Sequence, residues 1–331
     1  MGDVAMTVPV LRALTQQYPD VKVTVATRAF FEPIFHNIPN VSFFGVDVKQ
    51  KHKGFIGLLQ LFSDLRKLNV DAVADLHNVI RSKTLRKLFI ILGKKVASSN
   101  KGRAEKKALT QQNNKVFKPL KTMFEVHCDT FKKLGFEINL KKQIFPAKEN
   151  LSAKTVEILS DKSEFLIGIA PFAQYESKVY PQDLLEEIIK DLSENENYKV
   201  ILFGGGKQEI DILNNISSKY ENVINISGKI NFTEELNLIS NLNLMLSMDS
   251  GNAHLAAMYG VKTITLWGAT HPFAGFSPFN QKFENAIVSD RKKYPFLPTS
   301  VYGNKTVTGY QDVMRTILPE TVVDKIKDEL E

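Results

Sequence analysis

The sequence contains only one cysteine, Cys128, and no apolar stretch long enough to span a bilayer. A single thiol cannot form an internal disulfide, and no signal of charged, apolar and then small residues opens the chain. These absences predict a cytoplasmic protein without a transmembrane segment. The sequence also lacks an Asp-x-Asp motif, and its six histidines show no spacing typical of metal ligands, so we expect neither a metal nor another cofactor.

Acidic residues are scarce in the first half of the chain. Residues 1–150 hold 26 Lys and Arg against 12 Asp and Glu, whereas residues 151–331 hold 17 against 24. The excess is greatest in residues 81–121, where 13 basic residues accompany one acid, Glu105. Such a stretch predicts contact with a phosphorylated glycolipid, a membrane surface or nucleic acid, although a solvated lysine-rich face is the alternative. Nucleic acid is not expected, because no recognition module or interleaved aromatic residues accompany the charges.

The length of 331 residues and the alternation of short apolar runs with amphipathic stretches predict two α/β domains, each a parallel sheet with helices on both faces. We place the domains at residues 1–155 and 156–309, followed by a C-terminal segment, 310–331, whose helix begins after Pro319 and packs across both domains. The expected strands are residues 21–26, 41–46 and 70–75 in the first domain, and 165–170, 199–203, 223–226, 244–248 and 261–266 in the second.

The segment Leu244–Gly260 is the most informative, because an apolar strand runs through Asp249-Ser250-Gly251 directly into a helix. The unpaired N–H groups and the dipole of a helix start bind anions, and a glycine lets a phosphate approach the backbone closely. His254 lies near the same helix end and could donate to a phosphate or ribose oxygen. The alternative is that Asp249 or Ser250 only caps the helix and His254 is structural.

Two further loops also follow expected strands and precede helices. The first is 170–181, which contains Lys178, a candidate cation for a departing diphosphate. The second is 203–209, a glycine run that matches neither the dinucleotide fingerprint nor the Walker motif and that ends at Glu209. Lys178 could instead be a solvent-exposed lysine, and Glu209 a favourable acid in a first helical turn.

A carboxylate also stands at the start of the chain. Asp3 is expected in a loop before a helix that has Pro9 among its early residues. It could act as a general base, or it could cap that helix.

Together these segments resemble glycosyltransferase family 9, the ADP-heptose:lipopolysaccharide heptosyltransferases, over essentially the whole chain. The resemblance rests on 2–14, on the Lys178-x-x-Pro181 loop, and on 249–257 followed by 268–272. It implies two facing Rossmann-like domains of the GT-B type, with the acceptor bound mainly by the first and the nucleotide sugar by the second.

The resemblance also implies roles for individual residues. Asp3 would be the catalytic base and Lys178 the partner of the diphosphate, while Arg81 and Lys83 of the basic stretch are candidate acceptor contacts. The remaining donor contacts would be Ala173, Gln174, Glu209, Lys229, Ile230, Asp249, Ser250, Gly251 and His254, with Lys229 and Ile230 where the family holds adenine.

The chain departs from the family pattern at three places. It has Ala173-Gln174 where members carry Thr-Thr, and Thr270-His271-Pro272 where they often carry Thr-Asp-Pro. The family also begins with an apolar strand before the Gly-Asp pair, whereas this sequence opens Met1-Gly2-Asp3. We therefore expect the first domain to lack its first, central strand, because the start codon was assigned too late or because the sequence is a fragment. Without that strand, Asp3 is expected to be held less firmly.

The predicted function is an inverting transfer of a sugar, a heptose by resemblance, from a nucleoside-diphosphate donor such as ADP-heptose to an anionic lipopolysaccharide core acceptor. The chain is expected to be a monomer that works peripherally at the inner face of the cytoplasmic membrane. Two alternatives remain open: an epimerase or hydrolase of nucleotide sugars with the same architecture, and a non-catalytic protein that binds nucleotide sugars or polyanions.

Overall fold

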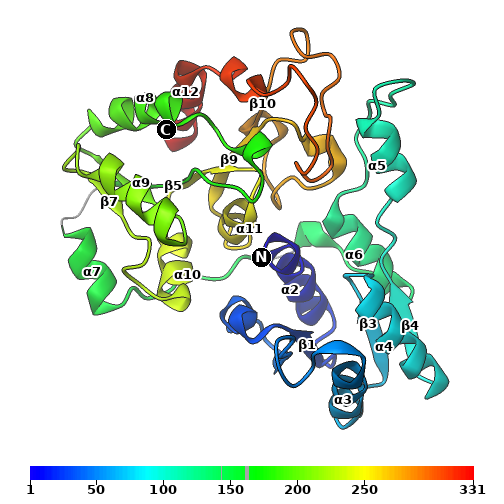
Figure 1. The fold of residues 1–331 in the computed structure, drawn as a ribbon. Helices are drawn as coiled ribbons and strands as arrows, with labels where there is room; N and C mark the ends of the chain where they lie inside the picture. The colour runs from blue at the N-terminus through cyan, green and yellow to red at the C-terminus, as the bar shows by residue number, and fades with distance from the viewer. Residues whose placement is uncertain (143, 161–163) are drawn as a thin grey trace. The chain divides into compact units, whose positions relative to one another are not determined.

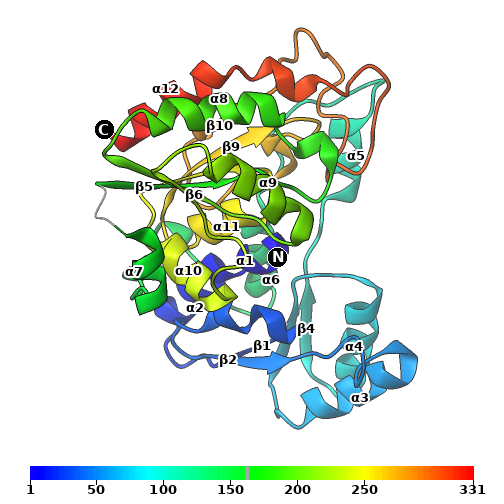
Figure 2. The same ribbon diagram turned by 60° about the vertical axis from the view of Figure 1, so that its left-hand side comes forward.

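The computed structural model describes residues 1–142, 144–160 and 164–331 (Figures 1 and 2). The chain packs as two compact units. Unit 1 comprises residues 3–102 and 121–144 with Met1, and unit 2 comprises residues 103–120 and 145–331 with Gly2. Residues 103–120 thus pack with the C-terminal unit, although the sequence boundary at residue 155 places them in the first domain. Among the helices of the described ranges, none is both long and apolar enough to cross a bilayer.

Unit 2 is built on a six-stranded, fully parallel sheet of order β10-β9-β8-β5-β6-β7. Its strands are β5 (Phe165–Ala170), β6 (Tyr198–Leu202), β7 (Val223–Asn225), β8 (Leu244–Met248), β9 (Lys262–Trp267) and β10 (Ala286–Val288). Its α-helices are α5 (Arg103–Thr110), α7 (Ala153–Leu159), α8 (Gln182–Ser193), α9 (Lys207–Ser217), α10 (Phe232–Asn241), α11 (Gly251–Ala257) and α12 (Pro319–Leu330). Short 3₁₀ turns are η3 (Glu176–Lys178), η4 (Pro272–Ala274), η5 (Phe283–Asn285) and η6 (Val313–Thr316).

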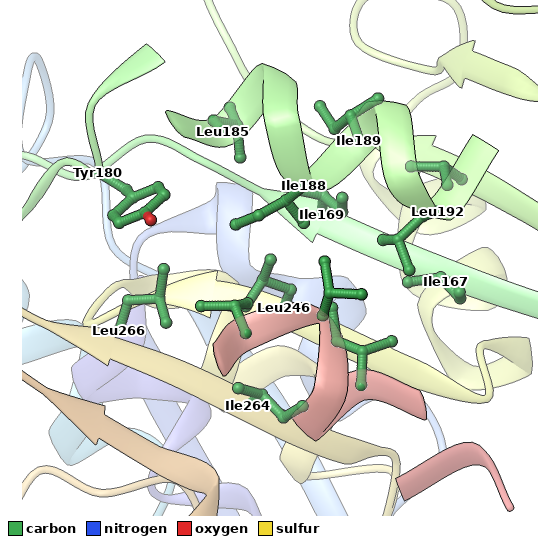
Figure 3. Close-up of a cluster of buried hydrophobic side chains, with 14 of the residues drawn as sticks. Ile167, Ile169, Tyr180, Leu185, Ile188, Ile189, Leu192, Leu246, Ile264 and Leu266 are labelled. Atoms are coloured by element: carbon green, nitrogen blue, oxygen red, sulfur yellow. The ribbon is translucent and has the colours of Figure 1, made fainter. Parts of the chain in front are cut away.

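Helices cover both faces of this sheet, with α8 and α12 on one face and α10 and α11 on the other (Figure 2). The apolar positions of α8 recur at helical spacing, at Leu185, Ile188, Ile189 and Leu192, and all four are buried. They point toward β5, β8 and β9 in Figure 3. Strands β6 and β8 are buried at every residue, as expected for a parallel sheet covered on both faces.

Unit 1 has two separate two-stranded parallel sheets in its described residues. Strand β1 (Val23–Thr27) pairs with β2 (Val41–Gly45), and β3 (Ala72–Asp75) pairs with β4 (Lys95–Ser98). The helices are α1 (Gly2–Ala5), α2 (Val8–Gln17), α3 (Gly54–Arg66), α4 (Ile80–Ile91) and α6 (Met123–Lys132), with 3₁₀ turns η1 (Ala29–Phe35) and η2 (Leu140–Lys142). The core of this unit centres on α2, where residues 8 to 15 are all buried.

The sequence analysis located most of these elements and missed several short ones. All eight expected strands form, with ends shifted by no more than about two residues. The unexpected strands β4 and β10 have four and three residues, too few for a periodic signal. Helices α5 and α7 have only eight and seven residues, about two turns, over which a helical period is hard to recognise. The helix expected after Pro319 is α12, which packs against α8 in unit 2 (Figure 1).

Candidate functional site

The order of strands in unit 2 reverses between β5 and β8. From β5 the chain adds β6 and β7 on one side, and then returns to add β8, β9 and β10 on the other. Open parallel sheets bind ligands at such a switch point, outside the carboxyl ends of the strands. The loop after β5 carries Ala173, Gln174 and Lys178, and the loop after β8 carries Asp249 and Ser250. These two loops hold half of the ten donor residues suggested by the sequence.

An ion pair joins the two loops at this point. The Nζ atom of Lys178 lies 2.9 Å from Oδ2 of Asp249, and the two side chains are only 12% and 9% exposed. Lys178 is therefore not the freely solvated lysine of the alternative interpretation. An ammonium group has three donors, so this pair leaves two that can reach a ligand oxygen. Lys178 is thus a fixed cation at the edge where a ligand is expected.

Two backbone segments fix the turn that carries Lys178. The hydroxyl of Ser177 donates to the carbonyl of Gly303 at 2.7 Å, and the Ser177 carbonyl accepts from Ala269 N at 3.1 Å. Gly303 has φ +84°, and a Cβ built on it would lie 2.5 Å from Cδ of Lys178. Gly303 therefore packs directly against the lysine stem. The sequence analysis missed this contact, because glycine at 303 indicates only a turn and not which side chain the turn meets.

The start of α11 has no side-chain cap. Ser250 occupies the N-cap position, but its side chain makes no capping bond to the helix, and its hydroxyl instead lies 3.0 Å from that of Ser247. The helix begins at Gly251, and His254 is buried in it. The simple capping interpretation therefore does not hold for Ser250.

The loops after β6 and β7 lie along the same edge of the sheet as the Lys178 loop. An oxygen of Glu209 accepts from Gly205 N at 2.7 Å, so this carboxylate braces the glycine loop. A Cβ on Gly204 would lie 3.3 Å from the ring of Phe172, which puts this loop beside the one after β5. After β7, Lys229 is exposed and Ile230 half-buried. In the loop after β5, Ala173 packs on the core and Gln174 is exposed.

In unit 1, Asp3 lies in the short helix α1 and not in the loop that the sequence predicts. An acid in a first helical turn is favoured by the helix dipole, which explains the difference. Its carboxylate is 66% exposed and lies 3.9 Å from Nε2 of His77. His127 lies 2% exposed within the unit, and burial lowers its pKa to about 4 although the charge of Asp3 opposes this shift. Asp3 therefore has an exposed carboxylate that lies within the long contact distance of the His77 imidazole.

The basic stretch divides between the two units. Arg81 and Lys83 lie in the first turn of α4 in unit 1, where Arg81 donates to the carbonyl of His52 at 2.6 Å. Lysines 106 and 115 belong to unit 2, where Lys106 is buried over the ring of Phe276. The basic stretch is therefore shared between two separately packed units.

A second group of cations lies in unit 2 and was not anticipated from the sequence. Lys115 donates to the carbonyl of Pro298 at 2.8 Å, and Arg291 donates to that of Leu297 at 3.0 Å. Arg291 also stacks on Phe117, whose ring contacts His271. Burial, together with the neighbouring charges, lowers the pKa of Lys115 to about 8 and that of His271 to about 4. This group anchors residues 103–120 to unit 2.

Within the described ranges, no three His, Cys, Asp or Glu side chains gather as they would around a metal ion. The candidate site of unit 2 therefore consists of one ion pair, a helix start and glycine-rich loops.

Comparison with known proteins identifies the family of this chain. The model of glycosyltransferase family 9 (heptosyltransferase) matches residues 58–306. The lipopolysaccharide core heptosyltransferase OpsX of Haemophilus influenzae is 25% identical over 335 residues, covering 99% of this chain and 93% of that protein.

Two solved structures share the fold. A family 9 glycosyl transferase from Veillonella parvula has a TM-score of 0.75 at 19% identity, covering 100% of this chain and 94% of that one. The ADP-heptose lipopolysaccharide heptosyltransferase II of E. coli has a TM-score of 0.68 at 19% identity, covering 99% and 95%. Because the family model spans most of the chain, the protein belongs to glycosyltransferase family 9, the heptosyltransferase family.

Proposed function

We propose that this chain is an inverting heptosyltransferase that moves a heptose from ADP-heptose, or a closely similar donor, to a lipopolysaccharide core acceptor. The observation that carries the proposal is the ion pair of Lys178 and Asp249 at the switch point of the unit 2 sheet. Family membership and the names of the relatives supply the sugar, the nucleotide and the acceptor.

In this proposal unit 2 binds the donor. Lys178 and the N–H groups at Gly251 neutralise the diphosphate, and His254, Ser250 and Glu209 line its cradle. Ala173 and Gln174 follow β5 on the same loop as Lys178, while Lys229 and Ile230 flank the adenine. A fixed cation stabilises the charge that develops on a departing diphosphate, and electrostatic stabilisation of this kind often contributes more to catalysis than any other single effect.

Asp3 is the proposed general base. Its carboxylate takes the proton of the acceptor hydroxyl, whose oxygen attacks the anomeric carbon. The bond from that carbon to the diphosphate oxygen breaks, and the nucleoside diphosphate leaves with the electron pair. Attack opposite the leaving group inverts the anomeric configuration. Arg81 and Lys83 are proposed to bind anionic groups of the acceptor, and the chain to act as a monomer at the inner face of the cytoplasmic membrane.

The test combines a transfer assay with a binding assay. The purified chain is incubated with ADP-heptose and a lipopolysaccharide core acceptor, and the product is examined by mass spectrometry and by NMR of the anomeric proton. Asp3→Asn is expected to lower turnover by roughly 10²–10⁴-fold, because the hydroxyl loses its base. The donor dissociation constant should stay within about twofold. Asp20→Asn, at another exposed acid of unit 1, is the matched control and should leave both values unchanged.

The outcomes separate the alternatives. Unchanged turnover in Asp3→Asn removes Asp3 from the role of base. Conversion of the donor without acceptor indicates an epimerase or hydrolase, and donor binding without any reaction indicates a non-catalytic protein.

A further inference from the structure

Unit 1 holds large apolar side chains in solvent at the starts of two helices. Phe55 and Ile56 in the first turn of α3 are 70% and 83% exposed, and Ile80 at the first residue of α4 is 84% exposed. Leu59, one turn further along α3, is also exposed. We call these four residues the apolar edge. Single exposed apolar residues are ordinary, but a cluster of this kind marks an interaction surface.

The two helix starts lie at the same end of the α3–α4 pair. Arg81, at the start of α4, donates to the carbonyl of His52, just before α3, at 2.6 Å. Further along, Phe62 of α3 meets Phe89 of α4 with ring centroids 5.2 Å apart. Because early residues meet early ones and late residues meet late ones, the helices run side by side in the same direction (Figure 2). The two helix starts that carry the apolar edge therefore lie side by side.

Local contacts hold this surface rigidly in place. The Asp47 carboxylate accepts from the backbone N–H groups of Lys49 and Gln50, each at 3.0 Å. Asp64 lies 2.7 Å from Lys51 and 3.3 Å from His52, which ties the loop before α3 to that helix. The exposed apolar residues thus follow a braced loop, and their exposure is a property of the fold.

Basic residues flank the apolar edge in the sequence. Lys49, Lys51 and Lys53 precede α3, and Arg81 and Lys83 follow Ile80. The acids of the same region, Asp47 and Asp64, are already bound by backbone N–H groups and by Lys51 with His52. Apolar side chains within a basic rim fit the interface of an anionic bilayer, in which the apolar groups enter the acyl boundary and the cations meet the headgroups.

We propose that the apolar edge docks unit 1 on a bilayer containing anionic phospholipid. The inference rests on the proposed function in one respect, because Arg81 and Lys83 are also the proposed acceptor contacts and stand next to Ile80. Docking there brings the sugars of a membrane-anchored acceptor to those residues while its lipid part stays in the bilayer.

The experiment compares the two ends of α4. Ile56→Ser/Ile80→Ser alters the apolar edge, and the matched control Ile90→Ser/Ile91→Ser alters the other end of α4, about 16 Å from Ile80 along the helix. Ile90 and Ile91 are 55% and 79% exposed, so both double variants remove exposed isoleucines. Binding is measured by co-sedimentation with phosphatidylethanolamine vesicles, with and without phosphatidylglycerol.

The parent chain should bind the vesicles that contain phosphatidylglycerol, and Ile56→Ser/Ile80→Ser should weaken this binding by about tenfold or more, because two isoleucines that enter the bilayer are lost. The control should stay within about twofold. Binding that is equal in both double variants, or that does not require phosphatidylglycerol, overturns the proposal.

A transfer assay distinguishes failure of the surface from failure of the enzyme. With a core acceptor freed of its lipid, Ile56→Ser/Ile80→Ser should turn over like the parent, whereas with acceptor embedded in vesicles it should be slower by a similar factor of about ten. A loss that is equal on both acceptors overturns the docking role. If the parent transfers sugar to neither acceptor but the vesicle binding still depends on Ile56 and Ile80, the proposed function fails and the docking surface stands.

Discussion

The two units differ in how completely their helices cover their strands. In unit 2, six paired strands form one sheet, and β6 and β8 are buried throughout. In unit 1, the four strands form two separate pairs, and most of their residues are only half-buried. Of the large apolar side chains that are exposed, those of α3 and α4 form the main group.

The difference indicates a division of work. A sheet that helices cover on both faces holds its loops at fixed positions, as the Lys178–Asp249 pair and the Gly303 contact show in unit 2. Unit 1 instead presents an open carboxylate, Asp3, and an apolar edge with basic residues around it. We expect unit 2 to be pre-organised for a small donor and unit 1 to be adapted to a large, membrane-bound acceptor.

The prediction with the largest expected effect tests whether unit 2 alone binds the donor. Lys178→Met keeps the stem against Gly303 but removes the charge, and it should lower kcat/KM by about 10²–10³-fold, as loss of one preorganised electrostatic group does. The donor dissociation constant, measured by calorimetry, should rise. Arg81→Gln in unit 1 is the counterpart, and it should raise the acceptor KM while leaving donor affinity within about twofold. Weaker donor binding in Arg81→Gln would break the comparison.

The next effect concerns pH, because acidification should destabilise unit 1 more than unit 2. Burial lowers the pKa of His127 in unit 1 to about 4 and raises that of Glu235 in unit 2 to about 7. Between pH 7 and pH 5 the unfolded histidine gains a proton that the folded one does not, so unit 1 loses about 2 kcal/mol of stability. In the same window the folded Glu235 gains a proton that the unfolded glutamate lacks, which adds a similar amount to unit 2. The buried His271 of unit 2, whose pKa is also lowered to about 4, removes about as much, so the stability of unit 2 should change little.

Two unique residues make this contrast measurable. Trp267, the single tryptophan, is buried in unit 2, and Cys128, the single cysteine, lies beside His127 in unit 1. Urea unfolding followed by Trp267 fluorescence and by labelling of Cys128 with a pyridyl disulfide reports each unit separately. His127→Gln should abolish the loss in unit 1, whereas Glu235→Gln should produce a loss in unit 2, because the effect of His271 is then no longer offset. Parallel shifts of both probes with pH would contradict this assignment.

The smallest expected effect tests how rigid the donor loop is. Gly303 and Gly309 have φ angles of +84° and +81°, so alanine strains the backbone alike at both positions. Only at 303 would the new methyl group meet Lys178, because nothing lies within 4 Å of it at 309. Gly303→Ala should raise the donor KM by about tenfold, the equivalent of roughly 1.4 kcal/mol, and Gly309→Ala should not. Equal donor KM values for Gly303→Ala and Gly309→Ala in steady-state assays would show that Lys178 tolerates displacement.

Local sequence determined the elements and the loops that carry the candidate residues. Strands β5 and β8 form where the apolar runs predict, and Lys178 and Asp249 follow them in the expected turns. Periodicity and turn residues act over a few neighbours, and for that reason they can be recognised in a sequence. Asp3 was assigned to a loop because a helix of four residues, α1, leaves no periodic signal.

Only the tertiary structure decided which of these loops meet. The contact of Lys178 with Asp249 spans 71 residues of sequence, and that of Gly303 with Lys178 spans 125. The packing of residues 103–120 against unit 2 and the exposure of Ile56 and Ile80 are likewise not visible in the sequence pattern. Apolar residues at helical spacing give the same sequence pattern whether their face is buried or exposed, because burial depends on segments that are distant in the chain.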